Sequence, residues 1–184
     1  MKFIYTILTV VLTSITALAQ NQHSPVEVTP AILKTIKSEL SKEAEALKAR
    51  LKASSEAAIV VEFTLDTFLI EKFQEKYIDY DWSTAGMRLS TYEAAAKYDS
   101  LLNKYYKKLS GVLKPTDRLL LVNAQKAWIS FRDKEQKLIG IVSKEEYSGG
   151  GTIQQLIDAG YYLELVRRRL FQIYQHYSRA TQTD

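Results

Sequence analysis

The sequence predicts an all-α protein, and three observations support this prediction. Apolar residues recur every three or four positions along most of the chain, which is the period of an amphipathic helix. Only 7 Gly and 3 Pro occur in 184 residues, too few for the many tight turns of an all-β fold. The β-branched run from Ile59 to Val61 has no hairpin signal beside it. We therefore expect an antiparallel bundle of about five helices after a cleaved signal peptide.

The N-terminus has the pattern of a secretory signal peptide over residues 1–19. Lys2 precedes an apolar stretch from Phe3 to Ala17, and Ala17-Leu18-Ala19 supplies the small-x-small pattern that signal peptidase accepts. No basic stop-transfer cluster follows, and no Cys stands at the cleavage point to carry a lipid. We expect a mature chain without a membrane anchor, in the periplasm or secreted.

Residues 20–29 are polar and are predicted to form a flexible leader. Residues 30–80 are predicted to form a helical hairpin that Thr29 caps and Ser54-Ser55 interrupts. The first half has clear helical spacing, with apolar residues at positions 33, 36, 40, 44, 47 and 51. In residues 56–80 the β-branched run favours a strand. Phe68, Phe73 and Tyr77 favour a helix, which we assign because no partner strand is evident.

Residues 81–178 are predicted to form the main helical domain, with three helices and a tail that frays over residues 179–184. The first helix is expected to bury a stripe of residues at helical spacing: Tyr92, Ala96, Asp99, Leu102, Tyr106, Leu109 and Leu113. After a turn at Lys114–Asp117, the second is expected to bury Leu121, Ala124, Trp128, Phe131, Glu135, Leu138 and Val142. The third is expected to bury Leu156, Leu163, Val166, Leu170, Ile173 and Tyr177.

The chain offers little for catalysis, because it contains no Cys and only 2 His. His23 lies in the leader and His176 near the C-terminus, and neither accompanies a nucleophile motif. The acidic residues are those of solvated helix faces: Asp79, Asp81, Asp99, Asp133, Glu135, Glu145 and Glu146. We therefore predict no catalytic residue, no cofactor and no metal site.

Basic residues do not indicate a nucleic-acid partner, because the formal net charge is only +4 and the chain is predicted to be exported. Two basic clusters, Lys104 with Lys107 and Lys108, and Arg167 to Arg169, are interpreted as solvated helix faces.

Polar residues on the predicted inward stripes are more informative. Each set shares one helix face, and a polar side chain on an inward face needs a hydrogen-bond partner. We predict a polar network between helices: Asp99, Asn103, Gln125, Trp128, Arg132, Asp133 and Arg169. The network is either a structural brace or the lining of a ligand pocket.

The segment from Tyr147 through Ser148, Gly149, Gly150 and Gly151 to Thr152 contains the only Gly cluster of the chain. Glycine permits unusual backbone angles and close approach of another molecule, and Thr152 is placed to cap the next helix. The segment is either a plain connector or a recognition loop. It lacks the Lys-Ser/Thr ending of a phosphate-binding loop.

These residues resemble a known family. Ser83–Met87, Asp99–Tyr106, the Ala124–Asp133 run, the Gly-Gly-Gly-Thr loop and Arg169 are together similar to the lysozyme-inhibitor LprI-like family. The resemblance covers about residues 62–177. It implies a small helical protein of the bacterial envelope, named after a member that inhibits lysozyme, the muramidase that cleaves peptidoglycan.

The chain departs from the family where many members, by our alignment, place Cys: Ser90, Gln136 and Tyr161 stand at those positions. Helix packing must therefore replace the disulfides. The resemblance implies a non-enzymatic protein that binds a lysozyme-type muramidase. Our candidate contacts are the glycine loop or a local acidic patch, either Asp79 with Asp81 or Glu145 with Glu146. The alternative is an envelope module that binds peptidoglycan or another exported protein.

Overall fold

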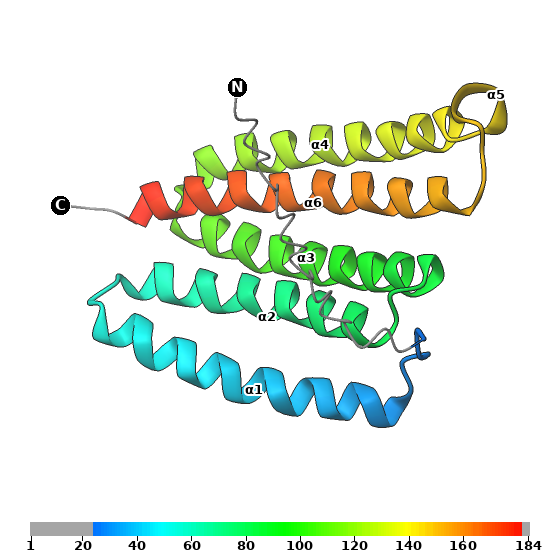
Figure 1. Ribbon diagram of the computed structural model, residues 1–184. Helices are drawn as coiled ribbons and strands as arrows, with labels where there is room; N and C mark the ends of the chain where they lie inside the picture. The colour runs from blue at the N-terminus through cyan, green and yellow to red at the C-terminus, as the bar shows by residue number, and fades with distance from the viewer. Residues whose placement is uncertain (1–23, 182–184) are drawn as a thin grey trace, which may run out of the picture.

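The structure, a computed structural model, describes residues 24–181 and consists of six helices (Figure 1). They are α1 (Pro30–Ala53), α2 (Ala58–Tyr80), α3 (Thr84–Val112), α4 (Pro115–Val142), α5 (Glu145–Ser148) and α6 (Thr152–Thr181). No strand occurs among these residues, so the all-α prediction is confirmed. The predicted signal peptide, the first four leader residues and residues 182–184 lie outside the described range.

Helix starts and breaks follow local chemistry. Thr29 Oγ1 accepts a hydrogen bond from Ile32 N at 3.3 Å, and Pro30 begins α1. Ser54 and Ser55 separate α1 from α2, with Ser55 at φ 59°. The ambiguous stretch after them is helical from Ala58, as assigned. Its apolar residues pack against neighbouring helices, which outweighs the strand preference of the β-branched run.

The start of α3 is built around a close approach of Asp81 to Gly86. Ser83 Oγ accepts from Gly86 N at 3.0 Å and donates to Asp81 Oδ1 at 2.6 Å. A Cβ added at Gly86 would lie 2.2 Å from Asp81 Cγ. Glycine at this position leaves room for the Asp81 carboxylate, which explains the Ser-Thr-Ala-Gly run in physical terms.

Consecutive long helices run antiparallel, and α3 and α6 form the closest pair, with α2 on the other side of α3 (Figure 1). Because α4 lies between them in the chain, α3 and α6 run in the same direction (Figure 1). α1 packs on α2 and α4 packs on α6, so these two helices form the outer members of the fold.

Two clusters of buried residues form the core. The larger joins α2, α3 and α6 with Leu121 of α4, and Phe63 stacks on Tyr174 with ring centroids 3.6 Å apart. The smaller joins α1 and α2 around Ile36 and Phe73. Val28 packs against this cluster, and Val26 N donates to Tyr80 O at 2.8 Å, so the described part of the predicted leader contacts the hairpin.

The predicted inward stripe of α3 is partly wrong. Tyr98 and Tyr105 are buried, whereas Tyr92 is 43% exposed and Tyr106 is half-buried. Helices α2 and α6 cover α3 on two sides, so the buried face is wider than one stripe and is centred elsewhere. The hydroxyls of the buried tyrosines are satisfied: Tyr98 donates to Glu71 at 3.0 Å and Tyr105 donates to Asp66 at 3.1 Å.

The predicted inward stripe of α4 is also wrong beyond its first turns. Leu121 is the one buried residue of this 28-residue helix, while Phe131, Leu138 and Val142 are each more than half exposed. At the other end of the chain, α6 continues to Thr181, beyond the predicted fraying point at residue 179. Thr181 Oγ1 donates to Tyr177 O at 3.0 Å in that last turn.

Candidate functional site

All seven residues of the predicted polar network lie in one chain of contacts that begins between α3 and α4. Arg132 Nη1 lies 3.7 Å from Asp99 Oδ1, and Arg132 Nη2 lies 2.8 Å from Asp133 Oδ1. Asn103 Nδ2 donates to Asp99 Oδ2 at 3.4 Å. The cluster therefore joins α3 to α4.

Trp128 connects this ion pair to α6. The Arg132 guanidinium lies 5.3 Å from the centre of the Trp128 ring, and the Arg169 guanidinium lies 5.9 Å from it. Arg169 Nε donates to Gln125 Oε1 at 3.0 Å, and Arg169 Nη1 donates to Gln172 Oε1 at 3.3 Å. Burial lowers the pKa of the Arg169 guanidinium, which still keeps its charge because arginine is not deprotonated in proteins.

The cluster lies at the edge of the fold and not in its core. Asn103 and Asp133 are exposed, and Asp99, Gln125, Trp128, Arg132 and Arg169 are half-buried. The expected inward placement fails because α4 packs mainly on α6, so the residues between α4 and α3 stay partly exposed. Solvent screening consequently weakens the Arg132 ion pairs.

The glycine segment connects α5 to α6. Gly149, Gly150 and Gly151 all have positive φ, at 77°, 66° and 89°. Sequence reasoning missed α5, whose single turn contains Tyr147 and Ser148. Thr152 is the first residue of α6 and not its cap. Gln154 Nε2 donates to Ser148 O at 3.2 Å and fixes the loop to α6.

A groove of about 780 Å³ separates α4 from the first half of α6, and we call it the α4–α6 groove. Apolar side chains of both helices line it: Phe131, Leu138 and Val142 from α4, and Ile157, Tyr161 and Leu165 from α6. Trp128 and Arg169 of the polar cluster also line it, as does Ser148 of the glycine segment. Two residues of the polar cluster and one residue of the glycine segment therefore line the same groove.

The sequence contains a signal for this groove that the search for one apolar stripe per helix missed. α4 carries apolar residues on more than one face, including Leu119, Leu120, Ile129 and Ile141 outside the predicted stripe. A helix that packs on one neighbour cannot cover all of them. The excess of apolar faces over packing partners predicts an exposed apolar surface.

One predicted basic face is largely ion-paired instead of solvated. Lys104 Nζ lies 2.6 Å from Asp66 Oδ2 and 2.9 Å from Glu62 Oε1, and Lys108 Nζ lies 2.6 Å from Glu62 Oε2. Burial opposes ionisation of Glu62, but hydrogen bonds from Lys108 and Lys104 outweigh it and lower the pKa of that carboxyl. These three ion pairs form a ladder that joins α2 to α3. Of the three lysines, only Lys107 is exposed.

Within residues 24–181, no group of three His, Asp or Glu side chains is arranged to hold a metal ion. None of the helices between residues 24 and 181 has an uninterrupted apolar stretch that could span a lipid bilayer. The groove instead combines an apolar floor with a polar cluster at one end and a glycine loop at the other. This arrangement suits contact with another molecule's surface.

A family model described as lysozyme inhibitor LprI matches residues 79–173, which include all of α3, α4 and α5 and most of α6. No curated protein and no solved structure matches the chain. The match contains the polar cluster, the glycine loop and the α4–α6 groove, and it leaves out α1 and nearly all of α2. The chain belongs to the lysozyme inhibitor LprI family.

Proposed function

We propose that this chain is an exported, non-enzymatic protein that binds a lysozyme-type muramidase and inhibits it. Family membership supports the class of partner. We place the binding surface at the α4–α6 groove, because apolar side chains of a long helix are exposed there next to a glycine loop.

Exposed apolar area gives the groove the composition of an interface core. Phe131 and Tyr161 are 53% and 60% exposed, and aromatic side chains are enriched at the centres of protein interfaces. Trp128 and Arg169 add a large ring and a hydrogen-bonded cation at one end. These are the residue types that most often dominate binding energy.

The glycine loop supports a second contact, with the substrate cleft of the muramidase. Three successive glycines make a slender segment, and Tyr147 beside it is 64% exposed. A slender loop can enter a cleft that a bulkier segment cannot. Gly150 at φ 66° cannot become Pro without a change in the loop path, because Pro fixes φ near −65°.

Charge has a smaller part in this proposal. Animal-type lysozymes are basic and the whole chain has a formal charge of +4, so long-range attraction does not assist association. Glu145 and Glu146 on α5 are exposed next to the loop and supply local negative charge. Association is therefore expected to depend on short-range contact and to vary little with ionic strength.

The test is a lysozyme lysis assay with the mature chain, residues 20–184, titrated to several-fold excess. Dose-dependent protection is expected, and it should be lost in Gly150→Pro and in Leu138→Glu, which places a charge in the groove. Leu119→Glu is the matched control, because Leu119 is 64% exposed on the same helix but does not line the groove. Equal loss in all three variants would exclude the groove as the contact.

Absence of protection against several lysozyme types would overturn the proposal. Retention of the chain by purified cell wall would then favour the alternative, an envelope module that binds peptidoglycan.

A further inference from the structure

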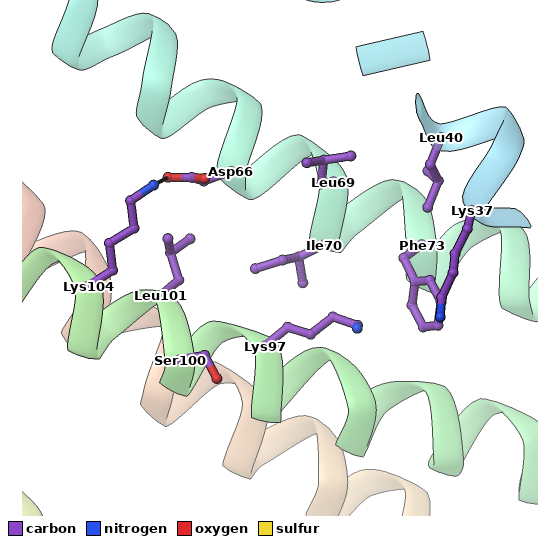
Figure 2. A pocket seen from close by; sticks show the side chains of 10 residues that line it. All are labelled: Lys37, Leu40, Asp66, Leu69, Ile70, Phe73, Lys97, Ser100, Leu101 and Lys104. Carbon is purple, nitrogen blue, oxygen red and sulfur yellow. Dashed lines mark hydrogen bonds and ion pairs between the residues drawn. The ribbon is translucent and has the colours of Figure 1, made fainter. Parts of the chain in front are cut away.

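A second cavity, of about 470 Å³, opens between α1, α2 and α3 (Figure 2). The helices α1 and α2 lie on the opposite side of α3 from α4 and α6 (Figure 1). Leu40 of α1, Leu69, Ile70 and Phe73 of α2, and Leu101 of α3 form its apolar surface. Lys37, Lys97, Lys104 and Asp66 are its charged side chains. Its volume is in the range of small-ligand sites, and we call it the hairpin cleft.

One end of the hairpin cleft carries positive charge that carboxylates neutralise only in part. Lys97 Nζ lies 4.5 Å from the centre of the Phe73 ring, and the nearest carboxylate oxygen paired with it, on Glu93, is 3.9 Å away. Lys37 lies at the same end (Figure 2) and has no ion-pair partner among residues 24–181. Two ammonium groups thus border one apolar floor.

The opposite end is neutral overall. Asp66 Oδ2 accepts a hydrogen bond from Lys104 Nζ at 2.6 Å (Figure 2), so this carboxylate is paired with a lysine. The same oxygen accepts from Tyr105 Oη at 3.1 Å. An anionic group would meet the Asp66 carboxylate there, whereas at the Phe73 end it would meet Lys37 and Lys97. A ligand with one anionic end would therefore lie with that end near Phe73 and with the rest of its length toward Asp66.

We propose that the hairpin cleft binds a single-chain anionic amphiphile. Its carboxylate lies between Lys37 and Lys97, and its unbranched apolar tail covers Leu69, Ile70 and Leu101. Partial desolvation by the apolar floor strengthens the pairing of the carboxylate with the two lysines. The tail removes from water its own apolar surface and that of Leu69, which is 38% exposed, and this supplies the remaining driving force.

The hairpin cleft does not depend on the proposed muramidase contact. Lys37, Asp66 and Phe73 precede residue 79, where the family match begins, and only the α3 side of the cleft lies within the matched residues. Inhibition and amphiphile binding can therefore be measured separately, and a negative result for one does not contradict the proposal for the other.

The test is calorimetric titration of the mature chain with dodecanoate below its micelle-forming concentration. Saturable binding to one site is expected, with weaker binding of the neutral dodecanol and of the cationic dodecyltrimethylammonium. Lys37→Gln with Lys97→Gln should weaken dodecanoate binding about tenfold, the scale of two partly exposed charge contacts. Lys52→Gln, an exposed lysine of α1 away from the cleft, is the matched control and should bind as the wild type does.

Leu69→Glu gives a second test, because Leu69 is 38% exposed and lines the cleft without belonging to the buried core. A carboxylate there should abolish binding of dodecanoate while circular dichroism shows an unchanged fold. Equal affinity for the anionic and cationic amphiphiles, or no effect of the double lysine variant, would overturn the proposal. Uptake of many molecules per chain would do the same, because it indicates detergent-like binding.

Discussion

The Arg169 guanidinium of α6 donates a hydrogen bond from Nε to the Gln125 side chain of α4 at 3.0 Å. This bond crosses between two helices that make few other contacts, since α4 buries only Leu121. Arg169 also lies over Trp128, so one side chain makes both a hydrogen bond and a cation–π contact to α4. Arg169 thereby helps to hold α4 beside the groove, together with Leu121 in the core and the hydrogen bond from Ser143 Oγ to Asp158 Oδ1.

Arg169→Ala is therefore expected to destabilise the chain by about 1–2 kcal/mol, because it leaves Gln125 without its partner and uncovers Trp128. Urea denaturation followed by circular dichroism measures the change. Arg167→Ala, on the same helix and largely exposed, is the control and should change stability by less than about 0.5 kcal/mol. Equal stabilities of the two variants would mean that α4 is fixed by other contacts.

The close approach of Asp81 to Gly86 gives a prediction with a matched pair of glycines. Gly86→Ala would place a Cβ 2.2 Å from Asp81 Cγ, so the loop that positions α3 must move, at a cost of about 2–4 kcal/mol. Gly111→Ala, near the end of the same helix, meets no atom within 4 Å and should be neutral or stabilise by up to about 1 kcal/mol. Thermal melts of the two variants should move in opposite directions or differ by many degrees. Similar melts would show that the Asp81 side chain relocates freely.

The helices could be predicted from the sequence because their signals are local. Pro30 and Pro115 begin helices, Ser54-Ser55 interrupts one, and three glycines separate α5 from α6. The residues that each helix buries could not be predicted as well, because burial depends on how many neighbours a helix has. α3 has two close neighbours and buries a wider face than its period suggests, whereas α4 has one and leaves predicted core residues exposed.

The candidate site shows the same division between local and long-range information. The spacing of Asp99 with Asn103, and of Gln125 with Trp128 and Arg132, places these residues on shared helix faces, and the structure brings them together. Their partial exposure follows from helix packing, which the spacing does not contain. The hairpin cleft depends on three helices and was not foreseen, because Lys37, Asp66 and Lys97 carry no motif.

The ladder between α2 and α3 predicts a specific acid dependence of stability. The folded state lowers the pKa of Glu62 below its ordinary value of 4.5, so the ionised carboxylate favours folding above that value. The contribution is lost as pH falls through the lowered pKa, when Glu62 is protonated in both states. Glu62→Gln should therefore be less stable than the wild type at pH 7, and the difference should shrink below about pH 4.5. A difference that stays constant from pH 7 to pH 3 would exclude an ionic contribution of Glu62.

The buried tyrosines of α3 predict the opposite dependence at alkaline pH. Burial, reinforced by the carboxylates of Glu71 and Asp66, raises the pKa of Tyr98 and of Tyr105 above the ordinary value of 10.0. Both hydroxyls therefore stay protonated in the folded state when the same groups ionise in the unfolded chain. Their contribution to stability is fully present below pH 10 and is lost as pH rises toward the raised values.

Urea denaturation between pH 8 and pH 11.5 should consequently show a steep loss of stability in the wild type. Tyr98→Phe with Tyr105→Phe should start from a lower stability, because Glu71 and Asp66 lose hydrogen-bond donors, but should decline less steeply with pH. Tyr92→Phe is the control, since Tyr92 is largely exposed and should keep the wild-type slope. Lysine deprotonation adds the same background to all three chains, so the difference in slope isolates the two buried hydroxyls. Parallel curves for the wild type and the double variant would show that these tyrosines ionise equally in both states, and that water reaches them in the folded chain.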